Sequence, residues 1–221
     1  MAKKKTKKKA KKKSPSKAYF TFERTIERSL NLIVLQKPTE RIIIAHKTTS
    51  QVDSSDLLRA ALVLGVAAMD SYFTDIFAER FVPYLKKKGP NQAMVDLLQE
   101  AGLGVETALK IMIMRRPYRR IRTLVEDHLE KKTTQETNKI DKLFLVFALK
   151  NFTEHIARLK KRRTLLRSVT NAVKRRNKIV HGGDINSRGK LNPITTEDAK
   201  HKLNDIVLVV AGADEILQSQ L

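Results

Sequence analysis

The chain has 221 residues, with 45 Lys and Arg against 23 Asp and Glu, a formal net charge of +22 and no cysteine. The lack of cysteine excludes disulfides, cysteine-based zinc sites and thiol nucleophiles. The longest uncharged apolar run, 60–69, is shorter than the roughly 18 residues of a membrane span, and no signal-peptide pattern opens the chain, so we expect a cytoplasmic protein without a membrane partner.

Residues 1–17 form a low-complexity segment whose first 13 residues hold nine lysines and no acid. Like charges at this density repel one another, so we expect a disordered tail. It serves either as an electrostatic tether to nucleic acid or as a solubilising or localisation tail. Without these nine lysines, the remaining 36 Lys and Arg still exceed the 23 Asp and Glu. The folded part is therefore basic in its own right, which favours nucleic acid as a partner, although basic proteins also bind acidic proteins or lipids.

The first half of the chain contains two helical patterns. Apolar residues recur at three- and four-residue spacing from Ala18 onward, and Pro38 is expected to end that helix. Three consecutive isoleucines within 41–46 indicate a short strand or a buried connection. A cap at 53–56 then starts a long helix to about Val82, apolar nearly all round in its middle, as in the central helix of a bundle.

Pro83 and Gly89 are expected to break the chain, and further helices follow. Their expected bounds are 91–101, 105–114, 117–131, 140–160 and 165–181, with a last helix from Thr195 or Thr196 to Leu217. Gly182 and Gly183 close the 165–181 helix. Since there is little strand signal and no repeat at a fixed period, we expect an all-α fold: an antiparallel helical bundle that forms one domain over 18–221.

Arg176 breaks the apolar pattern of the 165–181 helix. On a helical wheel of about 100° per residue it lies near Val169 and Val180, in the middle of the apolar face, whereas Arg175 points well away. A guanidinium on a core face is costly unless it is paired. We therefore expect an anion opposite Arg176, either a carboxylate from another helix or a bound phosphate. The alternative is an arginine that snorkels at the bundle edge or closes a structural salt bridge.

His181 lies five residues further on, at the end of the same helix. Asn177 is one turn before it and can hydrogen-bond to the imidazole, while the glycines after it leave the ring open to a substrate. The helix dipole favours the protonated ring, and the surrounding lysines and arginines oppose it. An imidazole titrates near neutrality, as an acid–base catalyst must. A lone histidine at a helix end is usually only a polar surface residue, so its interpretation as a catalyst depends on Arg176 and Asn177.

The stretch 158–178 holds ten basic residues and no acid. The plain alternative is a solvated charged face, but such a face rarely lacks acids so completely. We interpret the stretch as a phosphate-binding track that leads to Arg176. The expected nucleic-acid contacts are Lys160, Lys161, Arg162, Arg163, Arg167, Lys174, Arg175 and Lys178.

The segment from Arg176 through Asn177 to His181 resembles the signature of the HEPN superfamily. That signature is an Arg with a polar residue directly after it, then a His a few residues on, near the end of a late helix in an all-helical bundle. The stretch 58–77 also resembles the long second helix of the superfamily, which often carries an acidic residue beside an aromatic one, and Asp70 matches that acidic residue. The resemblance in helix order covers nearly the whole chain. The resemblance in sequence motif is limited to these two segments.

The resemblance implies a metal-independent endoribonuclease that needs no cofactor. His181 would be the acid–base residue for attack of a ribose 2′-hydroxyl on the adjacent phosphate, and Arg176 would stabilise the charge that develops there. Asn177 would orient the site, and Asp70 would hold Arg176. The products would be a 2′,3′-cyclic phosphate and a 5′-hydroxyl, so the substrate would be RNA and not DNA. Members typically form homodimers with facing motifs, and many act as toxins or in antiviral defence, which implies an antitoxin or regulatory partner.

Other chemistries find little support in the sequence. The five histidines are not closely paired and no carboxylate cluster has ligand spacing, so we expect no metal site. Aromatic residues make up only 5%, too few for a platform that stacks single-stranded bases. The alternative function is a non-catalytic helical module that binds nucleic acid or a protein partner. A third interpretation is a structural interaction protein in which Arg176 is buried against Asp70.

Overall fold

The computed structural model describes residues 15–45 and 53–220, and it is all-α, as the sequence predicts. The long helices are α1 (Lys17–Ala45), α2 (Asp56–Lys88), α8 (Leu165–Gly182) and α9 (Thr196–Gln220). Between α2 and α8 lie α3 (Gln92–Glu100), α4 (Val105–Met112), α5 (Pro117–Glu130), α6 (Thr137–Phe144), the 3-10 helix η1 (Leu145–Phe147) and α7 (Phe152–Leu159). Within the described residues the β-type pairing is limited to one isolated bridge, between Ile185 and Leu191.

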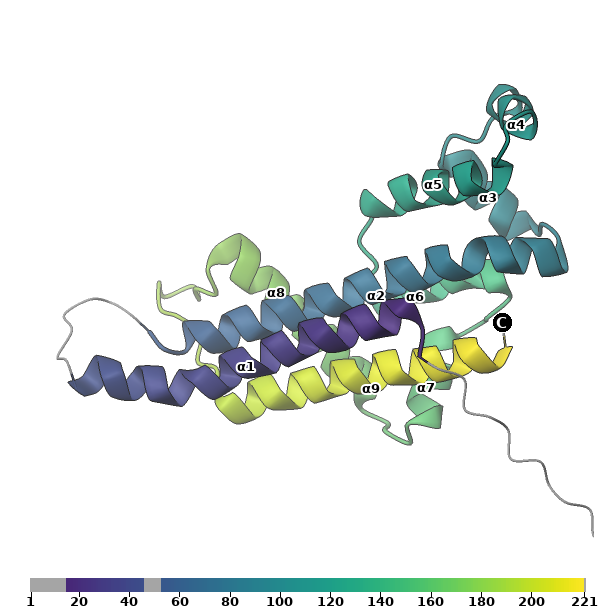
Figure 1. Cartoon of the computed structure of the whole chain (residues 1–221). Helices are drawn as coiled ribbons and strands as arrows, with labels where there is room; N and C mark the ends of the chain where they lie inside the picture. The colour runs from purple at the N-terminus through teal and green to yellow at the C-terminus, as the bar shows by residue number, and fades with distance from the viewer. Residues whose placement is uncertain (1–14, 46–52, 221) are drawn as a thin grey trace, which may run out of the picture.

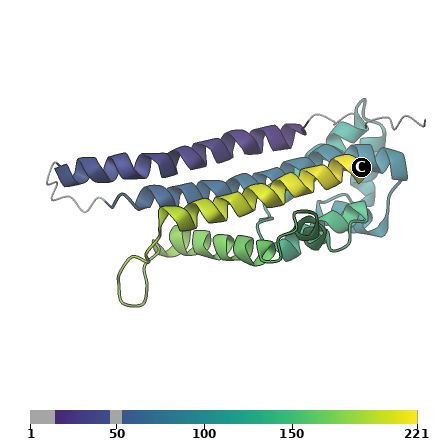
Figure 2. The same cartoon turned by 90° about the horizontal axis from the view of Figure 1, so that it is seen from below.

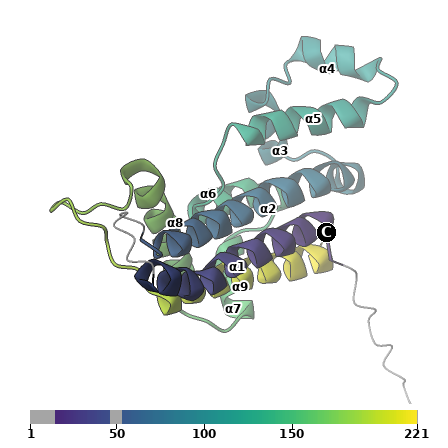
Figure 3. The same cartoon turned by 60° about the vertical axis from the view of Figure 1, so that its left-hand side comes forward.

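Consecutive long helices run in opposite directions along a common axis, so that α2 and α9 point the same way (Figure 1). The N–H of Ala18 donates to Glu79 at one end of the α1–α2 pair, and the amide of Gln36 donates to Ser54 at the other end. Figure 2 shows α1 on one side, α2 and α9 in the middle, and α8 on the other side. The helices α3, α4 and α5 form an arm that stands off the C-terminal half of α2 (Figure 3). This arrangement is the predicted antiparallel bundle with one added arm.

α2 is the central helix because it contacts α1, α5, α8 and α9. Burying each of its large apolar side chains contributes about 1.5–3 kcal/mol. Gly65 marks a close approach, since a Cβ there would lie 2.2 Å from Leu203 Cδ2 on α9. On the α1 side, the Ser29 hydroxyl donates to the Ala61 carbonyl at 2.6 Å. The three helices are therefore packed tightly at this level. The buried aromatic side chains of α2 are Tyr72, Phe73, Phe77 and Phe81.

By length and composition alone, α2 could cross a membrane, and it is the one helix of the described residues that meets this test. Of its most apolar 18-residue window, 56% is buried inside the protein. Its central place in the bundle accounts for that apolar character. The expectation of no membrane-spanning segment was based on the uncharged run 60–69 alone. The longer window was therefore overlooked, because the search for apolar runs stopped at the first charged residue.

Two prolines lie inside helices that they were expected to end. α1 continues through Pro38 to Ala45, so the expected strand or connection at 41–46 is helical as far as the structure describes it. α2 likewise continues through Pro83 and ends at Lys88, where Gly89 adopts φ 77°. Both prolines are exposed, so their rings do not disturb the core, and packing of each helix on its neighbours outweighs the lost backbone bond.

The expected single helix over 140–160 is broken into α6, η1 and α7. Ala148 and Asn151 adopt left-handed backbone conformations at the break, with φ of 60° and 50°. The bend allows Phe144 to stack on Phe152 with ring centroids 4.6 Å apart. The Asp141 carboxylate accepts bonds from the Thr153 N–H and hydroxyl at 2.7 and 2.9 Å, which satisfies the first turn of α7. Burial of the aromatic rings thus outweighs helical continuity here.

Order begins slightly earlier than the expected boundary at residue 18. Ser16 is buried, and its hydroxyl donates to Asp214 on α9 at 2.7 Å, so the turn before α1 is part of the fold. Lys17, expected in the tail, is the first residue of α1. The rest of the predicted tail, residues 1–14, lies outside the described residues.

A pocket of about 560 Å³ lies between α3, α5, α6 and the loop that precedes α6. His128 of α5 lines it and is half-buried, with Nε2 3.7 Å from the Glu100 carboxylate. The same carboxylate is 2.6 Å from Lys132 Nζ. Burial lowers the pKa of His128, and repulsion from Lys132 adds to this effect, while Glu100 opposes it. The folded protein therefore favours the neutral imidazole.

This environment makes His128 a source of acid lability. Below its ordinary pKa of 6.5, the imidazole binds a proton in the unfolded chain more readily than in the folded one, so stability falls as the pH is lowered through and below that value. In urea unfolding between about pH 8 and pH 5, we expect His128→Asn to lose less stability than the parent protein. The control is His155→Asn, because His155 is exposed on α7. Identical pH profiles for the parent and His128→Asn would contradict the prediction.

Candidate active site

The C-terminal end of α8 is closed as the two glycines predict. Gly183 adopts the left-handed conformation, with φ 58°, and its N–H donates to the Ile179 carbonyl at 3.1 Å. The N–H of Asp184 donates to the Lys178 carbonyl at 3.1 Å. These two bonds satisfy carbonyls that the helix end leaves open. His181 therefore lies in the last turn of α8, directly before a defined stop.

Asp184, just after this stop, is the centre of a buried ionic network. Its side chain is fully buried, and Oδ2 lies 3.0 Å from Arg59 Nε on α2 and 2.5 Å from Arg175 Nη2 on α8. The side-chain amide of Asn192 donates to the Asp184 carbonyl at 2.7 Å. Arg59 also donates to the Asn192 carbonyl at 2.8 Å. The network thus fixes the end of α8 against the first turns of α2 and holds the 184–192 loop closed.

Arg175 was expected to point away from the apolar face and to contact nucleic acid. The structure turns its guanidinium toward a buried carboxylate, while the contact with nucleic acid stays a prediction. Its guanidinium is paired with the buried Asp184 and also donates to the carbonyls of Asn192 and Pro193, both at 3.1 Å. The helical wheel placed Arg175 outside the apolar face but could not include the loop that folds back over that side of α8. Arg175 is therefore a structural residue.

Arg176, the anomaly of the sequence pattern, is half-buried and has no carboxylate partner among the described residues. Its Nη1 donates to Asn177 Oδ1 at 3.0 Å, and its Nε is buried without a hydrogen-bond partner. The apolar face that it shares is fully buried only up to Val173, since Val180 is 49% exposed rather than in the core as the wheel implied. Arg176 thus lies where the bundle opens toward solvent, with its charge uncompensated.

His181 is exposed, and its imidazole has no hydrogen bond within the described part of the chain. Asn177 was expected to bond to the imidazole, but its carbonyl oxygen accepts from Arg176 instead. The side-chain amide of Asn177 therefore orients the guanidinium of Arg176 rather than the imidazole of His181. Exposed apolar side chains occur close to His181 in the sequence, at Val180 and at Ile185 just past the helix stop. The ring is open to a substrate, as predicted.

Asp70 does not hold Arg176. Its Oδ1 accepts from the N–H and the hydroxyl of Thr134, at 2.7 and 2.6 Å, and its Oδ2 accepts from the Gln135 amide at 2.9 Å. Asp70 therefore anchors the loop between α5 and α6 to the middle of α2. The expected pairing with Arg176 is wrong, and with it the third interpretation, in which that pair is structural.

The basic track divides into paired and unpaired residues. Lys160 pairs with Glu215 at 3.0 Å, and Arg162 pairs with the buried Asp205 at 2.9 Å. With Arg175, these residues contribute to holding α7 and α8 in place, because each already pairs with a carboxylate. The sequence hid this because the acids come from α9 and from the loop after α8, outside the stretch 158–178. The members without an ion pair in the described chain are Lys161, Arg163, Arg167, Lys174 and Lys178.

Arg59 is the functional-site support that the sequence analysis missed. It is only 5% exposed, and on a wheel it falls about 60° from Leu62, within the apolar face of α2. The test that singled out Arg176 would therefore have found Arg59 too. No group of three or more His, Asp or Glu side chains is placed to hold a metal ion within the described residues.

Removing the charge of Asp184 tests the network. Asp184→Asn keeps a residue that tolerates the left-handed backbone at φ 60° but leaves two guanidinium groups without their buried counter-ion. We expect the free energy of unfolding in urea to fall by about 3 kcal/mol or more. The control is Glu106→Gln, which breaks an exposed Lys110–Glu106 pair and should change stability by less than about 0.5 kcal/mol. Equal effects of the two substitutions would contradict the account.

Comparison with known proteins gives one finding. The family model RiboL-PSP-HEPN matches residues 23–219, a range that contains α2, α8 and the whole Arg176–His181 segment. No curated protein and no solved structure matches the chain. The matched range covers most of the bundle and includes the arm. The chain belongs to the RiboL-PSP-HEPN family and, through it, to the HEPN superfamily.

Proposed function

We propose that this protein is a metal-independent endoribonuclease whose site is formed by Arg176, Asn177 and His181. Membership in the HEPN superfamily suggests a role on RNA. The observation that carries the finer proposal is the charge of Arg176. Arg175, which directly precedes it, and Arg162, which lies before α8, are neutralised by buried carboxylates, whereas Arg176 is half-buried, oriented by an amide and left without an anion. A phosphate of RNA supplies that anion.

The chemistry assigned to the three residues needs no metal. His181 takes the proton of a ribose 2′-hydroxyl, and the oxygen attacks the adjacent phosphorus. The bond to the 5′-oxygen of the next nucleotide breaks, and that oxygen takes a proton from a second, protonated imidazole or from water, so the products are a 2′,3′-cyclic phosphate and a 5′-hydroxyl. Arg176 stabilises the extra negative charge on the pentacoordinate phosphorus, and Asn177 keeps the guanidinium in position.

The geometry of α8 supports a homodimeric site. His181 is five positions after Arg176 in the helix, which corresponds to a rise of about 7.5 Å and an angle of about 140° between the directions of the two side chains. One protomer therefore presents the two groups on diverging sides of the helix. A second copy facing the first places the histidine of one chain near the arginine of the other, and two histidines can then act as base and acid on one phosphate.

The proposed setting follows from the activity. An enzyme that cleaves RNA is harmful unless it is controlled, which fits a toxin or an antiviral defence effector held by an antitoxin or regulatory partner. Its substrate is in the cytoplasm. The unpaired basic residues of α8 and of the segment before it guide the RNA backbone toward Arg176 through their charge.

Cleavage of RNA by variants of the full chain tests the proposal. In the presence of EDTA, we expect His181→Ala to lower the cleavage rate by about 10²–10⁴-fold. Arg176→Ala should lower it by about 10²–10³-fold. The matched controls are His155→Ala and Arg28→Ala, which remove an exposed histidine and an exposed arginine outside the site and should cleave at the parental rate. Circular dichroism checks that each variant remains folded. Parental activity in both site variants, or loss of cleavage with EDTA, would contradict the proposal.

The alternative function is a non-catalytic module that binds nucleic acid, and the unpaired residues Lys174 and Lys178 favour it independently of catalysis. Both are exposed on α8. For Lys174→Ala with Lys178→Ala, we expect the slope of log affinity against log salt to decrease by about 1.4 on single-stranded RNA, because two phosphate contacts are lost. Lys110→Ala, which removes a lysine paired with Glu106, is the control. If the slope does not change in the double variant, then Lys174 and Lys178 do not contact the RNA phosphates. Binding that survives His181→Ala with no turnover in the parent would favour the alternative.

A further inference from the structure

α4 has two apolar faces, and only one of them is packed. Ile111 is buried, and α5 is the main neighbour of the helix. The opposite face carries side chains that are almost fully exposed: Ile113 is 87% exposed, Val105 80% and Met112 74%. Leu109, one turn from Val105 and Ile113, adds to the same face. Four exposed apolar side chains on one face of a short helix indicate a site that binds a protein or a membrane.

This surface lies at the tip of a projecting arm. Figures 1 and 3 show α4 as the outermost helix of the α3–α5 arm, standing clear of the bundle. The exposed face is therefore convex, and it can enter a soft apolar layer without a partner shaped to receive it. A globular partner would need a matching groove.

The border of the apolar surface is strongly basic. Arg115 and Arg116 follow α4 directly, and Arg119 and Arg120 lie in the first turn of α5; all four are exposed, and none has an ion-pair partner within the described residues. Lys86 from the last turn of α2 lies 4.1 Å from the centre of the Tyr118 ring, so α2 adds a positive charge beside the first turn of α5. Arginines beside exposed apolar side chains match the anionic headgroups and acyl chains of a membrane surface.

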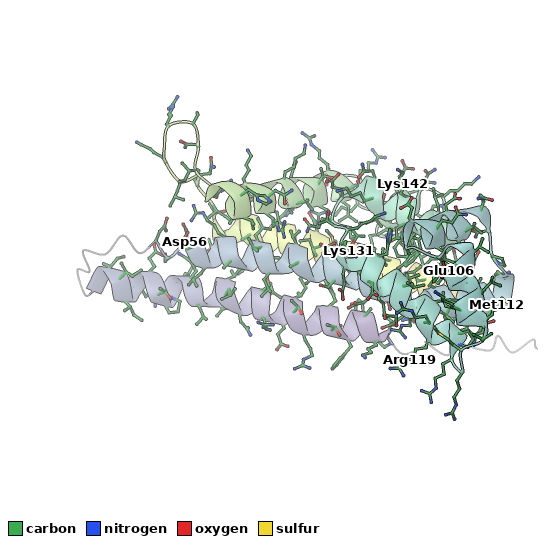
Figure 4. The ribbon with its side chains drawn as sticks, turned by 90° about the horizontal axis from the view of Figure 1, so that it is seen from above. Asp56, Glu106, Met112, Arg119, Lys131 and Lys142 are labelled. Atoms are coloured by element: carbon green, nitrogen blue, oxygen red, sulfur yellow. The ribbon has the colours of Figure 1, made fainter. Side chains whose placement is uncertain are left out.

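The lysine-rich segment is attached at the same end of the molecule. The first turn of α1 is tied to the C-terminal half of α2 through Ala18 and Glu79, next to Arg122 of α5. The nine lysines within residues 1–13 precede this point in the chain. In Figure 4, Met112 and Arg119 lie toward one end of the long axis, and Asp56 lies toward the other. Because the Arg59–Asp184 pair puts the end of α8 near Asp56, the Arg176–His181 site is at the end away from the arm.

We infer that the tip of the arm is a docking element for an anionic membrane surface, with the exposed face of α4 inserted among the lipid chains and the arginines after it bound to the headgroups. Three features at one end of the fold combine in this inference: the unpacked apolar face, the unpaired arginines and the attachment of the lysine-rich segment. RNA would bind the arginines but would leave the apolar face in water. This peripheral attachment needs no spanning helix, differs from the expectation of a protein without a membrane partner, and does not rest on the proposed ribonuclease activity.

Sedimentation of the full chain with vesicles tests the inference. We expect binding to vesicles of equal parts phosphatidylcholine and phosphatidylglycerol, and much weaker binding to vesicles of phosphatidylcholine alone. Met112→Ser with Ile113→Ser should lower the partition coefficient on the mixed vesicles by about tenfold or more, since two apolar side chains no longer enter the lipid. Arg115→Glu with Arg116→Glu should lower it on the mixed vesicles only.

The matched control is Val34→Ser with Leu35→Ser, which removes two exposed apolar side chains of α1 and should leave binding unchanged. The inference fails if the parent chain does not sediment with the mixed vesicles, or if Met112→Ser with Ile113→Ser binds as well as the parent. It also fails if the parent self-associates without vesicles and this substitution abolishes that association, because the face then belongs to a second copy. RNA cleavage by the same variant should equal that of the parent, which separates this test from that of the proposed function.

Discussion

The buried pairing of Arg59 and Arg175 with Asp184 is the interaction on which the rest of the candidate site depends. It joins the start of α2 to the end of α8 across 125 residues of sequence. Two guanidinium groups share one carboxylate that is fully buried, so each partner is indispensable to the others. The consequence for function is that this pairing sets the position of the candidate site. The last turn of α8, with Arg176 and His181, is fixed against the bundle by a network that does not use either residue, which leaves both free for a substrate.

The contrast between Arg175 and Arg176 shows how the fold divides its positive charge. Adjacent in sequence, one is neutralised by a buried aspartate and the other meets only an amide. The same division continues from the segment before α8 into its first turn: Arg162 is held by Asp205, while Arg163 and Arg167 have no ion pair in the described chain. A high net charge alone would say only that the surface attracts phosphates. The pattern of pairing says which of those charges remain available, and those on α8 lie along a helix that ends at the motif.

Much of the fold could be predicted from the sequence, because it is governed by local signals. Glycine ends α2 and α8, Asn91 caps α3, and the 3.6-residue pattern marks the long helices. The failures share one cause, which is that tertiary contacts outweighed a local rule. Packing carries α1 and α2 past Pro38 and Pro83, and buried aromatic rings break the expected 140–160 helix. At the site, the wheel identified Arg176 as an anomaly, but periodicity within one helix could not show that Asp70 is taken by Thr134 or that Asp184 reaches Arg59.

The central claim is that an uncompensated Arg176 and an open His181 make this HEPN bundle a nuclease that uses the 2′-hydroxyl of its own substrate. The chemical nature of the product ends tests this claim most directly. A defined RNA oligonucleotide is incubated with the full chain in EDTA, and the fragments are weighed by mass spectrometry. The account predicts fragments that end in a 2′,3′-cyclic phosphate and begin with a 5′-hydroxyl. Fragments with 3′-hydroxyl and 5′-phosphate ends, or an oligonucleotide left intact, would contradict it.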